Sequence, residues 1–410
     1  MLASMNEREM SWLSSRQASE RLGVKLATLY AYASRGLIRS LPGEGQRARL
    51  YAGDDVERLR TRHEARSGHG PVAAGALRWG EPVLETRICE VSAEGPRYRG
   101  HLATDLCRAG VSFERTAELL WTGTLPDAPG PAARSSCDAH ALWPLLRGRA
   151  ALPKMALVLA ALALSDSDRH AASDAAEFAR ARALFHWLAH APGRRPAPAE
   201  AAARVAGSLL AALRVPQKPT LISSVDRALV LCAEHELNAS AFAARVAASA
   251  GADLYACLGA AVNTLSGSAH GGMCDRVEAL IANIGSKERA KRIVNEWLAR
   301  GEQLPGFGHP LYPAGDPRAA LLLELAEAHG ARSAPAKTAF ALIEAMKRGG
   351  HPPPTLDAAL VTLCSCLELP AGSAACIFAI GRSAGWVAHA LEQRGAGYLL
   401  RPRARFVGTR

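Results

Sequence analysis

The chain has 410 residues, of which 49% are hydrophobic, so it is long enough for two or three domains with a sizeable buried core. Aromatic residues make up only 5% while alanine and leucine occur in nearly every segment, and this composition predicts closely packed helices and a mainly α fold. A formal net charge of +11 fits either a nucleic-acid partner or anionic substrates, so the charge alone excludes neither class.

Export and membrane insertion are not predicted. The charged residues Glu7, Arg8 and Glu9 interrupt the start of the chain, which argues against a secretory signal. The apolar run Met155–Leu164 is about half of the ~20 residues that a bilayer span needs. Nine cysteines without CxxC spacing indicate buried thiols. We therefore expect a cytoplasmic protein with neither a disulfide framework nor a metal site.

The N-terminal segment is predicted to contain two short helices. An amphipathic helix is expected over Ser14–Leu22, Gly23 and Val24 form a turn, and a second helix is expected over Lys25–Ala33. This spacing is typical of a helix-turn-helix motif.

A wing is predicted to follow. Short strands are expected at Arg35–Arg39 and Arg49–Tyr51 around a turn at Gly43–Gly45, and Asp54 can cap a third helix near Asp55. Residues 12–66 are therefore predicted to form a small winged helix-turn-helix domain.

The same segment carries an excess of positive charge, because seven Lys or Arg residues lie between Arg16 and Arg49 against two Glu residues. With Gly23 in the turn and Tyr30 and Tyr32 late in the second helix, it resembles the DNA-binding domain of MerR-type regulators and excisionases. The resemblance implies phosphate contacts and groove recognition. Candidate DNA contacts are Lys25, Thr28, Tyr30, Arg47 and Arg49. The alternative is a domain that packs on the rest of the chain or mediates assembly.

A second domain is predicted beyond a linker. The stretch Gly68–Gly75 lacks helical periodicity, so we place the linker at residues 67–76 and the start of the next domain at residue 77. Residues Val83–Tyr98 suggest a short β-hairpin, and helical patterns separated by Pro- and Gly-rich breaks continue almost to the C-terminus.

Within this domain, four short stretches place ionisable residues among glycines or prolines. They are Ala269–Gly272, Gly306–Pro310, Asp316–Arg318 and Thr355–Asp357. Each has a purely structural interpretation, because Asp followed by Pro is a good helix start and paired glycines often end a helix. Taken singly, none of them establishes a catalytic site.

Their order is more informative. Together with Tyr98–Gly100, His235–Ser240, Gly381–Trp386 and Arg401-Pro402, these stretches resemble the citrate synthase family over about residues 78–408. The resemblance implies a large helical domain (residues 77–271 and 370–410), a small helical domain (residues 272–369), an active site in the cleft between them, and a homodimer.

The family's chemistry implies roles for three residues. The methyl group of acetyl-coenzyme A is a very weak acid, so a base and an enolate stabiliser must act together. By resemblance, Asp357 is the base, His270 donates a hydrogen bond to the thioester oxygen, and His309 polarises and protonates the ketone of oxaloacetate. Acetyl-coenzyme A is a cosubstrate, and no tightly bound cofactor is expected.

A dicarboxylate substrate needs fixed cations, and the arginine fork can make two parallel bonds to one carboxylate. By resemblance, Arg318 and Arg382 bind oxaloacetate within one subunit, Arg401 reaches the neighbouring subunit's site, and His235 adds a hydrogen bond. Without the resemblance, we would interpret Arg401 as part of a solvated basic tail.

The sequence departs from the family pattern in places. Met273-Cys274 replaces the common Ala-Asn after the His-Gly-Gly motif, and Pro310 and Pro313 stand where many relatives have Arg or Lys. The predicted function is condensation of acetyl-coenzyme A with oxaloacetate to citrate. The alternatives are a 2-methylcitrate synthase that uses propionyl-coenzyme A, and a DNA-binding metabolite sensor with an inactive synthase domain.

Overall fold

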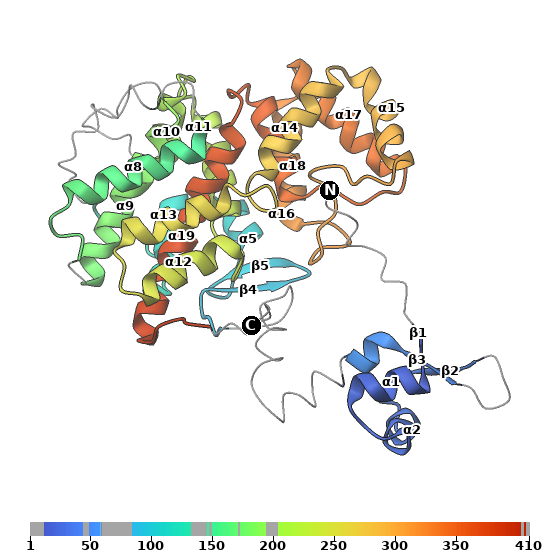
Figure 1. The fold of residues 1–410 in the computed structure, drawn as a ribbon. Helices are drawn as coiled ribbons and strands as arrows, with labels where there is room; N and C mark the ends of the chain where they lie inside the picture. Colours follow the sequence, from blue (N-terminus) through green and yellow to red (C-terminus); the bar gives the residue numbers. More distant parts are fainter. Residues whose placement is uncertain are drawn as a thin grey trace. The chain divides into compact units, whose positions relative to one another are not determined.

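The computed structural model describes residues 12–43, 49–57, 59, 84–132, 146, 150–170, 173–193, 204–402 and 406. The chain divides into two compact units, which are treated separately. One unit is Thr86–Leu400, and the other contains the residues before and after it (Figure 1).

The described part of the N-terminal unit consists of short helices and a three-stranded sheet. Its elements are β1 (Trp12–Ser14), α1 (Ser15–Leu22), α2 (Leu26–Ser34), β2 (Ser40–Pro42) and β3 (Arg49–Ala52). The antiparallel strands have the order β1-β3-β2. Residues 53–57 are again helical, so Asp54, which was predicted to cap this helix, lies inside it. The winged helix-turn-helix prediction is confirmed, with helix bounds within one residue of those expected.

Local chemistry explains the two helices. Ser14 caps α1 by accepting from the backbone N–H of Gln17 at 3.3 Å, while the Gln17 side chain accepts from the Ser14 N–H at 2.9 Å. Gly23 ends α1 in the left-handed region at φ 64°, which glycine adopts without strain. A buried core of Leu22, Leu29 and Tyr51 then holds the helices against the sheet.

One predicted strand was wrong. Residues 35–39 form the turn that ends α2, because the N–H of Gly36 bonds to the carbonyl of Ala33 and that of Leu37 to the carbonyl of Tyr32. The Arg39 N–H bonds to the Asp55 carboxylate at 2.9 Å. These donors are not available to a sheet, so the strand begins at Ser40. Arg47 and the linker at residues 67–76 lie outside the described residues.

The larger unit opens with a small antiparallel sheet and is otherwise helical. The sheet comprises β4 (Cys89–Ser92), β5 (Gly95–Tyr98) and β6 (His101–Leu102), so the predicted hairpin is present over its second half. The helices are α5 (Ala103–Arg108), α6 (Phe113–Thr122), α8 (Ala151–Ser165), α9 (Asp174–His190), α10 (Val205–Ala212), α11 (Pro219–Cys232), α12 (Ala239–Ser249), α13 (Leu254–Leu265), α14 (Met273–Ile284), α15 (Lys287–Ala299), α16 (Pro317–His329), α17 (Ala334–Arg348), α18 (Leu356–Cys366) and α19 (Ser373–Ala396). The mainly α prediction is confirmed.

Helix α19 is the centre of this unit. It packs against α6, α8, α9, α11, α12, α13, α14 and α18 (Figure 1). It is the one helix among the described residues with the length and apolar character of a bilayer span, but 94% of that stretch is buried inside the protein. Its apolar side chains are therefore covered by neighbouring helices.

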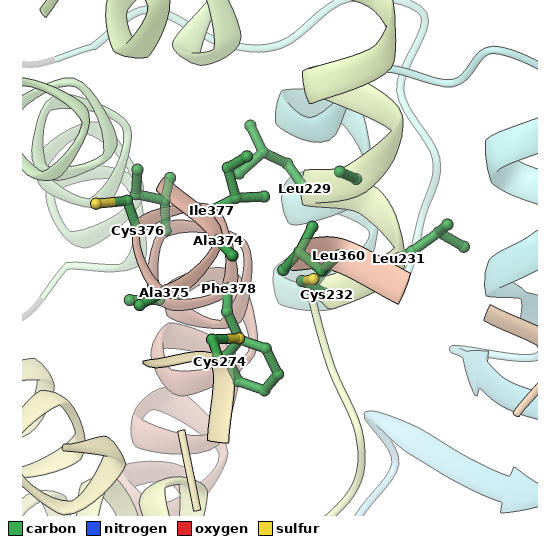
Figure 2. Packing of buried hydrophobic residues seen from close by; sticks show 14 of the residues in the cluster. Leu229, Leu231, Cys232, Cys274, Leu360, Ala374, Ala375, Cys376, Ile377 and Phe378 are labelled. Atoms are coloured by element: carbon green, nitrogen blue, oxygen red, sulfur yellow. The ribbon is translucent and has the colours of Figure 1, made fainter. Parts of the chain in front are cut away.

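Five helices from α14 to α18 form a second group, drawn in yellow to orange in Figure 1, in which α15 packs on α17 and α16 on α18. Figure 2 shows where this group meets the central helices, with Cys274 of α14 and Leu360 of α18 in one apolar cluster with Cys232 of α11 and Ile377 of α19. The division into a large domain (77–271 and 370–410) and a small domain (272–369) remains a prediction.

Candidate active site

The loop before α16 is joined to the start of α18 by backbone hydrogen bonds. The N–H of Gly308 bonds to the carbonyl of Pro353 at 2.9 Å, and the N–H of Thr355 bonds to the carbonyl of Gly306 at 2.8 Å. At Gly306, where φ is 83°, a Cβ atom would lie 2.6 Å from a Val277 methyl group, so only glycine fits. This pairing carries His309 towards the helix end that bears Asp357.

His309 lies in a cluster of rings. The His235 Nε2 atom is 2.8 Å from the hydroxyl of Tyr312, and the His235 and His309 rings meet edge to face with centroids 5.7 Å apart. Tyr312 packs on His309 at 5.1 Å, and the guanidinium of Arg318 lies 5.7 Å from the Tyr312 ring centre. Three predicted site residues from three chain segments are therefore brought together around Tyr312.

Arg318 is held by the residue that caps its own helix. Asp316 is the N-cap of α16, and its carboxylate accepts from Arg318 Nε at 3.0 Å and Nη2 at 2.7 Å. Both side chains are at most 3% exposed, and Arg318 Nη1 is buried with no hydrogen-bond partner among the described residues. Burial by itself would raise the pKa of Asp316, but Arg318 holds it below its usual value.

Arg382 stands on the central helix α19. Its Nε donates to the backbone carbonyl of Cys232 at 2.8 Å, and its guanidinium lies 4.8 Å from the ring centre of Phe378. The residue is 2% exposed. Burial is the main cause of the lowered pKa of His235 and of His270, and the charge of Arg382 lowers both further.

His270 lies in the turn between α13 and α14. Its Nε2 atom is 2.8 Å from the hydroxyl of Ser240, which also accepts from Trp386 Nε1 at 3.0 Å and contacts Asn238 Oδ1 at 2.7 Å. Ser240 has one hydrogen to give. When that hydrogen points to Asn238, His270 must donate from Nε2. When it points to His270, the neutral ring carries its hydrogen on Nδ1 and can donate from there.

The three histidines are neutral imidazoles near pH 7. Burial is the main cause in each case, lowering the pKa of His270 to about 4, that of His235 well below its usual value, and that of His309 to a smaller extent. The backbone N–H of Leu311 donates to His309 Nδ1 at 3.2 Å. A backbone N–H can only donate, so the hydrogen of the neutral His309 ring is on Nε2.

Asp357 lies in the first turn of α18, where the helix dipole favours a negative charge. Its Oδ1 atom is 3.4 Å from the thiol of Cys274, and its Oδ2 atom is 3.4 Å from the hydroxyl of Thr355. Burial raises the pKa of Asp357, while these two donors and the charge of Arg318 oppose the rise. The arrangement combines a carboxylate of raised basicity with neutral imidazoles and fixed cations.

Sequence reasoning did not identify three of these contacts. Tyr312, Ser240 and Cys274 were not singled out as site residues, yet each contacts a predicted one. Tyr312 follows His309 closely in the chain, and that proximity was the available signal. The contacts of Ser240 and Cys274 join distant segments and left no local pattern.

The remaining predicted residues belong to the other compact unit. Arg401 is exposed, and its role at a neighbouring subunit's site stays a prediction. In the helix-turn-helix unit, Lys25 is the exposed N-cap of α2, Tyr30 is 50% exposed, Thr28 is half-buried, and Arg49 is exposed on β3.

Comparison with known proteins gives two family matches. The model for "Citrate synthase, C-terminal domain" matches residues 76–403, and the model for "MerR HTH family regulatory protein" matches residues 13–70. A Mycobacterium tuberculosis protein with the provisional name citrate synthase 2 is 33% identical, over 80% of this chain and 91% of its own. A 2-methylcitrate synthase from Shewanella oneidensis is 28% identical, over 80% of this chain and 92% of its own.

Solved structures give the same picture. The crystal structure of citrate synthase from Thermotoga maritima superposes with a TM-score of 0.67 at 25% identity, over 80% of this chain and 94% of that one. The fold is therefore shared over nearly the whole length of that enzyme.

Proposed function

The chain belongs to the citrate synthase family, and we propose that its larger unit condenses acetyl-coenzyme A with oxaloacetate and water to give citrate and coenzyme A. The observation that carries the proposal is that one unit contains Asp357, three histidines of lowered pKa and two buried arginines. A metabolite-binding domain without turnover has no evident need for a carboxylate of raised pKa.

The proposed reaction assigns a proton transfer to Asp357 and to His309, and a stabilising hydrogen bond to His270. Asp357 removes a proton from the methyl group of the thioester, and His270 donates a hydrogen bond from Nδ1 to the developing enolate oxygen, for which Ser240 must direct its hydroxyl to His270 Nε2. The resulting enolate attacks the ketone of oxaloacetate. His309, with its hydrogen on Nε2, protonates the ketone oxygen. Water then hydrolyses the thioester to a carboxylate and free coenzyme A with release of one proton, and the proton held by Asp357 returns to His309, which restores both groups.

Oxaloacetate binding is assigned to Arg318, Arg382 and His235. In this structure Asp316 occupies two nitrogens of Arg318, so the buried Nη1 is the position left for a substrate carboxylate. His235 Nε2 is engaged with the Tyr312 hydroxyl. We therefore propose that a substrate oxygen takes the place of that hydroxyl when oxaloacetate binds.

We propose that the preferred acyl donor is acetyl-coenzyme A rather than propionyl-coenzyme A. A pocket distinguishes one methylene by only about 10- to 200-fold, so the proposal predicts a kcat/KM for acetyl-coenzyme A that is at least about 10-fold higher than that for propionyl-coenzyme A. Release of free thiol from each thioester in the presence of oxaloacetate measures the ratio. A higher kcat/KM with propionyl-coenzyme A would reassign the protein as a 2-methylcitrate synthase, and no turnover with either would favour the sensor.

We also propose that the active form is a homodimer in which Arg401 completes the neighbouring subunit's site. A dimer would present two copies of the helix-turn-helix unit. Paired recognition units are the common arrangement for DNA half-sites. The N-terminal unit is accordingly proposed to bind DNA through Lys25, Thr28, Tyr30, Arg47 and Arg49.

DNA binding predicts a defined salt dependence. Wild-type protein should bind a labelled mixed-sequence duplex with an affinity that falls steeply with salt, and Lys25→Glu or Arg49→Glu should each weaken binding and reduce the slope of log affinity against log salt by about 1. Fluorescence anisotropy measures both quantities. Lys337→Glu, an equal charge change at an exposed position of α17, is the control. Salt-independent or absent binding by the wild type would favour an assembly role.

A further inference from the structure

Cys274 lies directly behind the proposed base. It is the second residue of α14, is fully buried, and its Sγ atom is 3.4 Å from Asp357 Oδ1. The two residues are 83 positions apart in the chain, so the contact depends on the packing of the start of α14 against the start of α18. Figure 2 shows Cys274 within the apolar cluster that fills this junction.

The thiol is the donor in this contact. An ionised carboxylate can only accept, and burial together with the charge of Asp357 raises the pKa of Cys274 well above its usual value, so the sulfur keeps its hydrogen. A hydrogen bond donated to an ionised carboxylate stabilises the ionised form relative to the protonated one. The same hydrogen bond restricts rotation of the carboxylate, because it holds Oδ1 against Cys274 on α14.

We propose that Cys274 is a positioning residue for Asp357: its thiol orients the carboxylate, keeps Oδ1 occupied so that Oδ2 faces the thioester methyl group, and favours the ionised base. This proposal rests on the proposed function, since it assumes that Asp357 is the base. The residue acts through Asp357 and needs no contact with substrate.

Other described groups also favour the ionised carboxylate, among them the backbone N–H of Asp357 itself. Thr355, on the same helix terminus, donates to Oδ2 at 3.4 Å, and the charge of Arg318 on α16 acts in the same direction as the thiol. Cys232, at the end of α11, lies within electrostatic reach as a second protonated thiol. Removing the Cys274 donor leaves Thr355 and Arg318 in place, so the carboxylate should become harder to ionise without losing its charge partner.

The test is the acid limb of the pH–rate profile. Activity is lost as the pH falls through the pKa of the base, so Cys274→Ala should move the acid limb of kcat to higher pH by about half a unit to one unit. Cys274→Ser keeps a donor and should restore the wild-type limb. Cys376→Ala removes an equally buried thiol of the same cluster that does not contact Asp357, and should leave the limb unchanged.

A second measurement does not depend on turnover. The pKa of Asp357 can be read from the carbon-13 shift of its labelled carboxyl carbon, assigned by its loss in Asp357→Asn, and should rise by the same amount in Cys274→Ala. If Cys274→Ala fails to fold, Cys274→Val fills a similar volume without a donor and takes its place.

The outcomes separate the two proposals. Robust turnover with an unmoved limb and an unmoved Asp357 pKa, or an equal shift in Cys376→Ala, would overturn the role of Cys274 alone. Absent turnover with a shifted Asp357 pKa would overturn the synthase proposal and leave the thiol's effect on the carboxylate standing.

Discussion

Asp357→Asn is expected to lower kcat for citrate formation by about two to four orders of magnitude, because the amide cannot take a proton from the thioester methyl group. The side chain keeps its shape, and its oxygen can still accept from the Cys274 thiol. Oxaloacetate should therefore bind with an unchanged Kd, measured by calorimetry, and the free energy of unfolding should not fall, because burial opposes the charge at this position.

The matched control is Asp275→Asn. Asp275 is the residue after Cys274 and is exposed. Its substitution makes the same chemical change in the same part of the unit. It should keep wild-type kcat. A kcat for Asp357→Asn within a few-fold of wild type would remove Asp357 from the role of base.

Arg318→Gln is expected to have the largest effect on stability. It leaves the Asp316 carboxylate buried without its partner, and breaking a buried pair in this way costs about 3–5 kcal/mol in the free energy of unfolding. It also removes the Nη1 group proposed to bind oxaloacetate. Urea unfolding and the KM for oxaloacetate measure the two losses.

A double variant separates stability from binding. Asp316→Asn combined with Arg318→Gln removes both charges, and asparagine can still cap α16, so most of the stability should return while the KM for oxaloacetate stays high. The exposed Arg348→Gln, which breaks the pair with Glu344, should change neither quantity. Full stability in Arg318→Gln alone, or a normal KM in the double variant, would contradict the assignment.

The same pair predicts a pH dependence of stability. The pKa of Asp316 is lower in the folded protein than its ordinary value of 3.8, so its contribution is present above that pH. It is lost as the pH falls through the depressed pKa. The double variant should lack this acid-dependent loss.

Local rules predicted the helix starts well. The helix near Ser14–Leu22, the turn at Gly23 and the helix start at Asp316-Pro317 were predicted because a helix end depends on residues within a few positions of each other, whereas the capping box of Ser14 with Gln17 was not predicted. Asp316 also shows the limit of such reading. It is the predicted cap, and it is in addition the buried partner of Arg318.

The strand predicted at residues 35–39 failed for a local reason, the turn bonds of Gly36 and Leu37 that end α2, and for a non-local one. The backbone N–H of Arg39 is taken by Asp55, a residue 16 positions later, and propensity at residues 35–39 carries no information about that competition. The site contacts are of the same kind. The His235–Tyr312 bond spans 77 residues and the Cys274–Asp357 bond spans 83.

The sequence by itself determined the helical class, the helix-turn-helix motif, the family and the ionisable residues proposed for the site, because periodicity, capping and ordered motifs are properties of neighbouring residues. The tertiary structure decided which of those residues meet, which nitrogen of His309 carries the hydrogen, and that Tyr312, Ser240 and Cys274 support them. Hydrogen-bond partners, burial and the resulting pKa values depend on segments brought together only by folding.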